Sequence, residues 1–348
     1  MGQGIKAGGG SENLKPELQA QDILIDDILE TIVGKSSGAT ATAETILEGY
    51  TAYVGKELVT GKAKGVTING VKHNEGITLT PIYSNQAVST LPYQFYEGCA
   101  VFYRGQLHIL GSYHTSTAKN HYKYNGTSWE VASTLPYELT RGRAVVFNDE
   151  IHIMGGTSDV TGLYHYKWDG STWKKVSDLP YKFDRGSVVV YNNQIHILGG
   201  TGNQNGHYMW NESVWQNIDQ IPYGHYNGDA VVFNGEIHVL GGQSGAIQHH
   251  KWNNADGWVV MPSLPYMFSK GCAEVSEGKI HLMGSSGYDY VSAHYVWDGS
   301  NWSKISNLSK QCTSAASVVV EDEIHIFGDE TMTTIHHSPN YTTYRKGW

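Results

Sequence analysis

Residues 151–156 read IHIMGG, residues 195–200 read IHILGG and residues 237–242 read IHVLGG. Three further copies, LHILGS, IHLMGS and IHIFGD, occupy residues 107–112, 280–285 and 324–329. The histidines of the six copies recur at intervals of 42 to 44 residues, and they are His108, His152, His196, His238, His281 and His325. A period in this range indicates that one structural unit is repeated along the chain.

Each repeat predicts four short antiparallel strands, which we name A to D. It begins with Leu-Pro-Tyr or a close relative, and a glycine and an apolar strand follow, as in GRAVVF at 142–147. A two-residue turn signal such as Asn148-Asp149 then leads into the histidine strand, because hairpin turns of this kind need positive φ. A longer loop leads to a second hairpin, as in YHYKWDGSTW at 164–173, where the Asp-Gly dipeptide predicts a hairpin turn.

Six units of four antiparallel strands favour radial repetition, in which each sheet packs face to face on the next. Residues 91–348 are similar to the kelch family, whose repeats carry an apolar strand ending in Gly-Gly and a tryptophan in the fourth strand. The fourth-strand residues here are Trp129, Trp173, Trp215, Trp258, Trp302 and, in the sixth repeat, Tyr344. The resemblance implies an all-β, six-bladed kelch-like β-propeller with four antiparallel strands per blade over residues 76–348. Residues 76–90 are expected to lead into blade one and to add a strand that helps to close the ring.

Histidine stands in strand B where kelch sequences usually carry tyrosine. A second histidine column falls in strand C, at His121, His165, His207, His249, His294 and His336. Residues of one column are related by rotation of a whole blade, so the strand B imidazoles should lie on a ring instead of converging on one ion. We expect them to pack, with a ring nitrogen hydrogen-bonded to a nearby backbone or hydroxyl group. A two-ligand site made by the strand B and strand C histidines of one blade is the alternative.

The three cysteines are also explained by the repeat. Cys99 and Cys272 both lie just before the apolar run of strand A, and Cys312 lies four residues earlier in the sixth repeat. We interpret them as small semi-polar packing residues, with a soft-metal site as the alternative. No metal, no cofactor and no catalytic residue is expected, since no paired-carboxylate, nucleophile-base or phosphate-loop motif stands out.

The amino-acid composition excludes two classes of binding partner. The formal net charge is −9 and no Lys/Arg cluster stands out, so nucleic acid is not expected to bind. The chain has no run of about 18 apolar residues and no signal-peptide core at its start, so we expect no membrane partner and synthesis as a soluble protein in a cytoplasm.

Chain direction places the A–B and C–D turns on one face of the disc and the D–A and B–C loops on the other. The D–A and B–C loops, residues 329–334 of the sixth repeat among them, differ between repeats, and variable loops on a fixed scaffold commonly carry recognition. Their aromatic, amide and charged residues suit sugars, whose ring faces stack on aromatic rings while their hydroxyls form hydrogen bonds. The candidate ligand-binding residues are Tyr113, His114, Arg141, Asp184, Arg185, His225, Tyr226, Lys270, Tyr288, Asp289 and Tyr290.

The first ninety residues lack the repeat. Residues 15–35 predict a helix, since Pro16 suits its first turn and Gly34 its C-terminal end. Its heptad a and d positions are Leu14, Leu18, Gln21, Ile25, Ile28 and Ile32. Isoleucine at both positions shifts preference away from dimers, so a homotrimeric coiled coil is the simplest assembly, and a single helix packed on its own chain is the alternative. We divide this region into an oligomerisation segment at 1–37 and a small attachment module at 38–75, in which an amphipathic stretch at 42–65 precedes two short strands.

Both segments resemble modules of tail-fibre proteins from phages and prophages of Gram-positive bacteria. The resemblance implies a virion tail protein, made in the bacterial host cytoplasm, whose N-terminus attaches to other tail or baseplate proteins. The propeller is then a receptor-binding domain for a host cell-surface polysaccharide. One alternative is a glycan-modifying or sialic-acid-isomerising enzyme, which a cluster of Arg, Glu and His at the channel mouth would support. The other alternative is a structural tail component that contacts another virion protein.

Overall fold

The computed structural model describes residues 51–54, 57–60, 65–68, 71–74, 83–242, 247–305 and 307–337. Contacts divide the chain into two compact units, and the larger one runs from Tyr83 to His337. In the smaller unit, β1 (Thr51–Val54) pairs with β2 (Glu57–Thr60) and β3 (Gly65–Ile68) pairs with β4 (Val71–Asn74). The helix predicted over 15–35 and its six heptad positions lie outside the described residues. No helix among the described residues is long and apolar enough to span a membrane.

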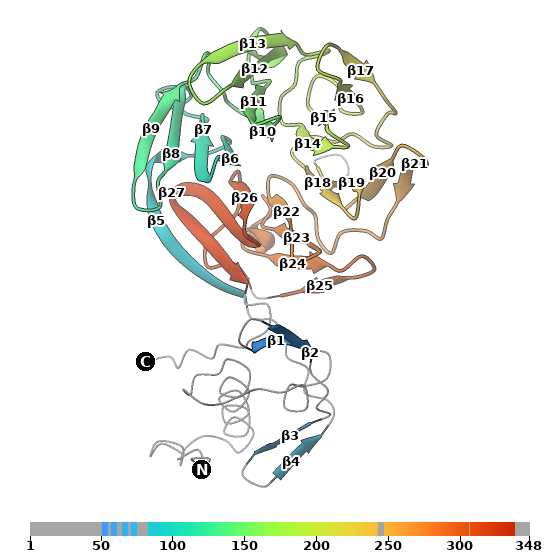
Figure 1. The fold of residues 1–348 in the computed structure, drawn as a ribbon. Coiled ribbons are helices and arrows are strands. Elements are labelled where there is room, and N and C mark those ends of the chain that lie inside the picture. Colours follow the sequence, from blue (N-terminus) through green and yellow to red (C-terminus); the bar gives the residue numbers. More distant parts are fainter. Residues whose placement is uncertain are drawn as a thin grey trace. The chain divides into compact units, whose positions relative to one another are not determined.

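Residues 83–337 form a β-propeller of radially arranged sheets (Figure 1). Five sheets have four antiparallel strands that follow one another in chain order. Strand A is innermost in each sheet, and the six A strands contact one another in turn around the centre (Figure 1). The 3₁₀ turns Thr161–Leu163 and Tyr288–Tyr290 interrupt two of the B–C loops.

The bounds of the five four-stranded blades follow the repeat. They are, in order, β6 (Cys99–Tyr103), β7 (Gln106–Leu110), β8 (Asn120–Tyr124) and β9 (Trp129–Thr134); β10 (Arg143–Phe147), β11 (Glu150–Met154), β12 (Tyr164–Trp168) and β13 (Trp173–Asp178); β14 (Ser187–Tyr191), β15 (Gln194–Leu198), β16 (His207–Trp210) and β17 (Trp215–Asn217); β18 (Asp229–Phe233), β19 (Glu236–Leu240), β20 (His249–Asn253) and β21 (Gly257–Val260); β22 (Cys272–Ser276), β23 (Lys279–Met283), β24 (His294–Trp297) and β25 (Trp302–Lys304).

The sixth position of the ring corrects the prediction. The expectation of six four-stranded blades is wrong, since the described residues form five, and the sixth repeat contributes to a three-stranded sheet of β26 (Ala316–Val320), β27 (Glu323–His337) and β5 (Tyr83–Phe95). Strand β27 continues past Gly328 with irregular pairing at Asp329–Thr331, so the predicted loop 329–334 and His336, predicted to lie in a separate strand C, belong to the same strand as His325.

Ring closure explains this difference. In the five full blades the glycine that ends strand B has positive φ and turns the chain; Gly155, with φ of 76°, is one example. A Cβ on Gly155 would lie 2.0 Å from the carbonyl oxygen of Phe183, because the D–A loop of the next blade passes over this glycine. For the sixth repeat the equivalent of Phe183 is Phe95, which is part of β5 and pairs with Asp329. The predicted closing strand is thus confirmed: β5 pairs antiparallel with β27 and joins the two ends of the propeller by backbone hydrogen bonds.

Strand B is buried on both faces because each sheet is packed between two neighbours. In β11, Ile151 and Ile153 pack on residues of blade one, whereas Met154 packs on Phe183 and Ile195 toward blade three. Full burial of one such aliphatic side chain contributes about 1.5–3 kcal/mol. These repeated contacts, summed around the ring, form the core.

The strand B and strand C histidines of each full blade form a buried dyad. Nδ1 of His108 lies 2.8 Å from Nε2 of His121, and the same atoms are 2.8–2.9 Å apart in the pairs His152–His165, His196–His207, His238–His249 and His281–His294. The rings also pack between blades, as His121 does against Trp168 and Trp173. The packing role agrees with the prediction. The predicted hydroxyl partner is found for His121 and His165, whose Nδ1 atoms lie 2.7 Å and 3.4 Å from the hydroxyls of Ser133 and Ser177, and the imidazole partner was not predicted. An ion bonded to both nitrogens would hold them roughly 3.3 Å apart, so these hydrogen-bonded pairs leave no space for one.

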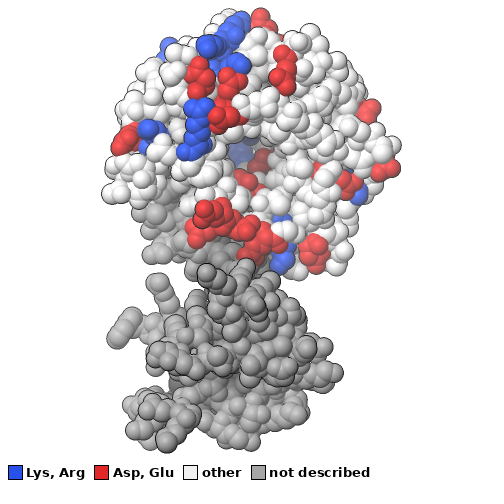
Figure 2. All heavy atoms as spheres, in the orientation of Figure 1, with Lys and Arg blue, Asp and Glu red and all other residues white. Residues whose placement is uncertain are grey.

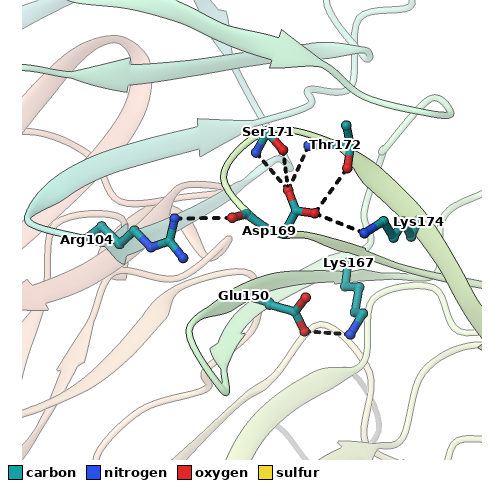
Figure 3. Close-up of polar contacts among 7 residues, drawn as sticks. All are labelled: Arg104, Glu150, Lys167, Asp169, Ser171, Thr172 and Lys174. Atoms are coloured by element: carbon teal, nitrogen blue, oxygen red, sulfur yellow. Dashed lines mark hydrogen bonds and ion pairs between the residues drawn. The ribbon is translucent and has the colours of Figure 1, made fainter.

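The A–B and C–D turns share a face, as chain direction predicts. Asn148 and Asp149 have φ of 50° and 58°, which confirms the hairpin turn. The Asp169 carboxylate accepts hydrogen bonds from the backbone N–H groups of Ser171 and Thr172, so the Asp-Gly dipeptide also forms a turn (Figure 3). Arg104, from the A–B turn of blade one, donates to the Asp169 carbonyl and ties the turn faces of two blades together (Figure 3).

Candidate functional site

A central channel of about 610 Å³ runs between the innermost strands. The described ring has a hollow at its centre in which both basic and acidic side chains are visible (Figure 2). Its ionisable lining residues are Glu97, Arg141, Arg143, Arg185, Asp229, Lys270 and Glu274. Four cations therefore face three carboxyl groups, in a chain whose net charge is −9. A concave cavity with convergent polar groups is the usual form of a small-molecule site.

One residue from each repeat surrounds the mouth of the channel. We call these six residues the mouth ring, and they are Glu97, Arg141, Arg185, Asn227, Lys270 and Ser314. Each has φ between 49° and 61°. The backbone N–H of each donates to the carbonyl oxygen of the one before it, at 2.6–3.0 Å, and Glu97 closes the circle by donating to Ser314. The backbone of the mouth ring is therefore uniform, while its side chains differ in nearly every repeat.

The left-handed backbone of the mouth ring follows from the packing beside it. The next residue is glycine in five repeats, and a Cβ on Gly186 would lie 2.3 Å from the Phe183 ring. Phe183 belongs to a buried column three residues before the glycine, together with Phe95, Leu139, His225, Phe268 and Cys312. Burial of this column fixes the loop, and the left-handed residue then carries its side chain at the mouth. Non-glycine residues in this backbone region are costly and cluster at functional sites.

The charged groups of the mouth ring are partly paired. Glu97 forms an ion pair with Arg141 and lies 3.6 Å from the Lys270 ammonium group. The Arg141 guanidinium also lies 4.8 Å from the centre of the Tyr113 ring, which is half exposed. His114 packs edge-on against Tyr113. An aromatic surface and cationic groups thus lie side by side at the mouth.

A second level of polar groups lies deeper in the channel, on the A strands. The Asp229 carboxylate accepts hydrogen bonds from the backbone N–H groups of Ala230 and Ala273, both at 2.9 Å. Glu274 accepts a hydrogen bond of 2.7 Å from the Ser317 hydroxyl. Enclosure by protein raises the pKa of Glu274 to about 8, and the nearby Asp229 carboxylate adds to the rise. Glu274 is therefore mostly protonated at neutral pH.

The structure brings some of the predicted ligand-binding residues together. Tyr113, His114, Arg141 and Lys270 meet around Glu97, and Arg185 belongs to the same mouth ring. Asp184 is buried beside Arg185 and accepts a hydrogen bond from Thr201. These residues define one side of the candidate site.

Other predicted residues lie elsewhere. His225 is fully buried, with its ring nitrogens 2.8 Å from the Ser187 hydroxyl and 3.2 Å from the Gly241 carbonyl oxygen. Tyr226 is half-buried, and Tyr290 stacks on Tyr266 at 4.9 Å. Asp289 is exposed on the 3₁₀ turn Tyr288–Tyr290, and the side chain of Tyr288 lies outside the described atoms.

The sequence interpretation missed Glu97, Asn227 and Ser314 at the mouth and Arg143, Asp229 and Glu274 inside the channel. A signal for the first three was present, since each stands immediately before the glycine, or its alanine replacement, that precedes strand A. The same alignment places His225 in the buried column with Phe95 and Phe183. The alternation of polar and apolar residues in strand A does not reveal the channel-lining residues Arg143, Asp229 and Glu274, because strand A borders the channel along its whole length.

The cysteines do not form a common site. Cys99 donates to the Gly142 carbonyl oxygen at 3.4 Å, whereas the sulfur atoms of Cys272 and Cys312 lie 3.3 Å apart. All three are buried and unbridged, and burial raises the pKa of Cys99 to about 12. Within the described ranges, no cluster of three or more His, Cys, Asp or Glu side chains is arranged to hold a metal ion.

Comparison with known proteins supports the fold alone. No protein-family model matches the sequence. No curated protein sequence is significantly similar to it. Among solved structures, the chain resembles the structure of YjhT with a TM-score of 0.61 and 14% sequence identity, over 72% of this chain and 96% of that chain. Fold and site together define a β-propeller with a charged central channel.

Proposed function

We propose that the propeller is a carbohydrate-binding domain and that its ligand binds at the mouth of the central channel. The mouth ring carries this proposal, because six equivalent backbone positions present different side chains over a cavity of about 610 Å³. A fixed scaffold with variable side chains at one opening is the usual arrangement of a recognition site.

The chemistry at the mouth suits a sugar that carries a negative charge. Tyr113 offers a ring on which an apolar sugar face can stack, and Asn227 and Ser314 offer groups that hydrogen-bond hydroxyls. Arg141 and Lys270 add cations, and only one carboxylate, that of Glu97, pairs with them in the described part of the chain.

We further propose that this binding serves attachment of a phage-type tail fibre to a bacterial cell-surface polysaccharide. The support is the resemblance of residues 16–35 and 42–65 to tail-fibre modules, and in this proposal the N-terminus joins other tail proteins as a homotrimer. Three linked propellers would compensate for weak individual sugar sites through effective concentration. Deletion of residues 91–348 should then abolish adsorption while particles still assemble. A propeller that only contacts another virion protein would instead disturb assembly.

A glycan-modifying enzyme is a second candidate, favoured by one observation. Burial raises the pKa of Glu274 inside the channel to about 8, the nearby Asp229 carboxylate adds to the rise, and a carboxylic acid with a raised pKa can serve as a general acid. Incubation of the full chain with an acidic polysaccharide separates the two candidates. New reducing ends that disappear in Glu274→Gln would favour the enzyme, and binding without new ends favours recognition.

Binding of the full chain to an array of acidic and neutral glycans tests the main proposal. We expect signals for acidic glycans that fall in Tyr113→Ala and in Arg141→Ala, since these changes remove the aromatic surface and a cation. Lys174→Ala is the matched control, because Lys174 lies at the start of β13, next to the C–D turn on the other face, and pairs with Asp169 (Figure 3). Equal loss in all three variants, or no binding to any glycan, would contradict the proposal.

A further inference from the structure

The cations of the channel fall into two groups. Arg141 and Lys270 share the single carboxylate of Glu97. Arg143 and Arg185 have no carboxylate within ion-pair distance among the described residues, although burial raises the pKa of the nearby Asp229 and the Arg143 charge partly opposes that rise. Among the described residues, the only side-chain hydrogen bond of Arg143 goes to the neighbouring Gly142 carbonyl oxygen, at 3.1 Å. Nε of Arg185 is buried and has no hydrogen-bond partner in the described part of the chain.

A guanidinium group without an ion-pair partner inside a cavity can bind an anion, because its N–H groups donate hydrogen bonds. Guanidinium groups bind carboxylates and phosphates through parallel N–H···O bonds, and such bonds strengthen where water is excluded. A buried N–H without a partner, such as Nε of Arg185, costs free energy until a ligand or a water molecule accepts its hydrogen bond. Since Arg143 begins β10 and Arg185 precedes β14, the two cations come from neighbouring blades.

The opposite side of the channel has different chemistry. Glu274 lies on β22, three positions around the ring from β10, so it faces Arg143 across the channel. Glu274 and Ser317 hold a shared hydrogen bond and offer further donor and acceptor positions for hydroxyl groups. Asp229 is less available, because both of its oxygens already accept backbone N–H groups.

We infer that the channel binds the terminal sugar unit of an acidic glycan end-on, with its oxyanion on Arg143 and Arg185 and its hydroxyls on Glu274 and Ser317. This inference rests on the proposed carbohydrate function and specifies its ligand. End-on binding follows from the walls: six inner strands surround the cavity, so a sugar in the middle of a chain reaches the mouth ring but not the inner level. The oxyanion can be a carboxylate or a phosphate of the terminal sugar unit, because guanidinium groups donate hydrogen bonds to both.

Ligand-observed NMR on the full chain tests the inference with glucuronic acid, glucose 6-phosphate and glucose as probes. We expect binding of at least one acidic probe, with glucose weaker by about tenfold or more, because charge-assisted hydrogen bonds are lost. Arg143→Gln and, as a second variant, Arg185→Gln should each reduce binding of the acidic probe about tenfold. Arg104→Gln, in which the lost cation lies at the A–B turn, is the control and should bind like the parent chain.

Two tetrasaccharides of equal composition, with glucuronate at the non-reducing end or at an internal position, test the direction of binding. Preference for the terminal acid, lost in Arg143→Gln, supports the inference. Equal affinity for both tetrasaccharides, or unchanged binding in both arginine variants, overturns it while leaving carbohydrate binding at the mouth intact. Absence of binding to every saccharide and to the glycan array overturns the proposed function itself.

Discussion

Mild acid is expected to unfold the propeller over a narrow pH range, because protons must enter the histidine dyads. Each dyad is almost fully buried, and burial lowers the pKa of the strand B histidine of each full blade to about 4, at His108, His152, His196, His238 and His281. A group with a lowered folded-state pKa is protonated first in the unfolded chain. Its contribution to stability is therefore complete above pH 6.5 and is lost as the pH falls toward 4.

The magnitude is large because the effect is repeated five times. A histidine with pKa near 4 when folded and near 6.5 when unfolded lowers the free energy of unfolding by about 2 kcal/mol at pH 5. Counting only the strand B histidine of each dyad gives about 10 kcal/mol for the five blades, which is comparable with the total stability of about 5–15 kcal/mol typical of folded proteins. Burial also lowers the pKa of the strand C histidines, so the full loss is larger. Near pH 5.5 the free energy of unfolding should change by at least about 6 kcal/mol per pH unit.

Urea unfolding of the full chain, followed by tryptophan fluorescence between pH 7.5 and 5, measures this slope. Replacement of one dyad by His196→Gln with His207→Gln should lower the slope by about one fifth. The control is His114→Gln, which removes an exposed histidine and should leave the slope unchanged. A parent slope of about 1.4 kcal/mol per pH unit or less, equal to one proton, would refute the reasoning.

Three further outcomes are expected. Gly155→Ala should lower the free energy of unfolding in urea by about 2–4 kcal/mol, since the added Cβ would collide with the Phe183 carbonyl oxygen. Gly105 has a similar φ but open space around it, so the control Gly105→Ala should lower the free energy of unfolding by about 1 kcal/mol. Glu274→Gln should raise the melting temperature at pH 8 but not at pH 4, because the folded chain resists ionisation of Glu274 while the unfolded chain ionises it above about pH 4.5; an equal gain at both pH values would contradict this. The native chain should show no thiol reactivity toward a chromogenic disulfide at pH 8, since Cys99, Cys272 and Cys312 are buried, and rapid labelling before unfolding would disprove their enclosure.

The repeat made much of the fold predictable. Strand A, strand B and their two-residue turn are local features, and signals such as Asn148-Asp149 identify them without knowledge of neighbouring blades. The number of full blades was predicted incorrectly because the difference is not local. Residues 323–337 keep the histidine motif, yet they extend as one strand since β5, from before the first repeat, pairs beside them.

For the candidate site, the sequence predicted ligand-binding residues on the loop face, such as Arg141 and Lys270, because their loops differ between repeats. It did not predict Arg143, Asp229 and Glu274 as lining the channel.

The sequence by itself determined the repeating unit, its strands and its turns, since hydrophobic alternation and turn chemistry act over a few residues. Only the tertiary structure decided which side chains face the channel, which imidazoles pair and how the ring closes. Glu97 and Lys270 are far apart in the sequence, as are β5 and β27, and they become neighbours only because the blades between them are arranged around a closed ring. Charge pairing and ring closure depend on that circular arrangement, which local sequence does not encode.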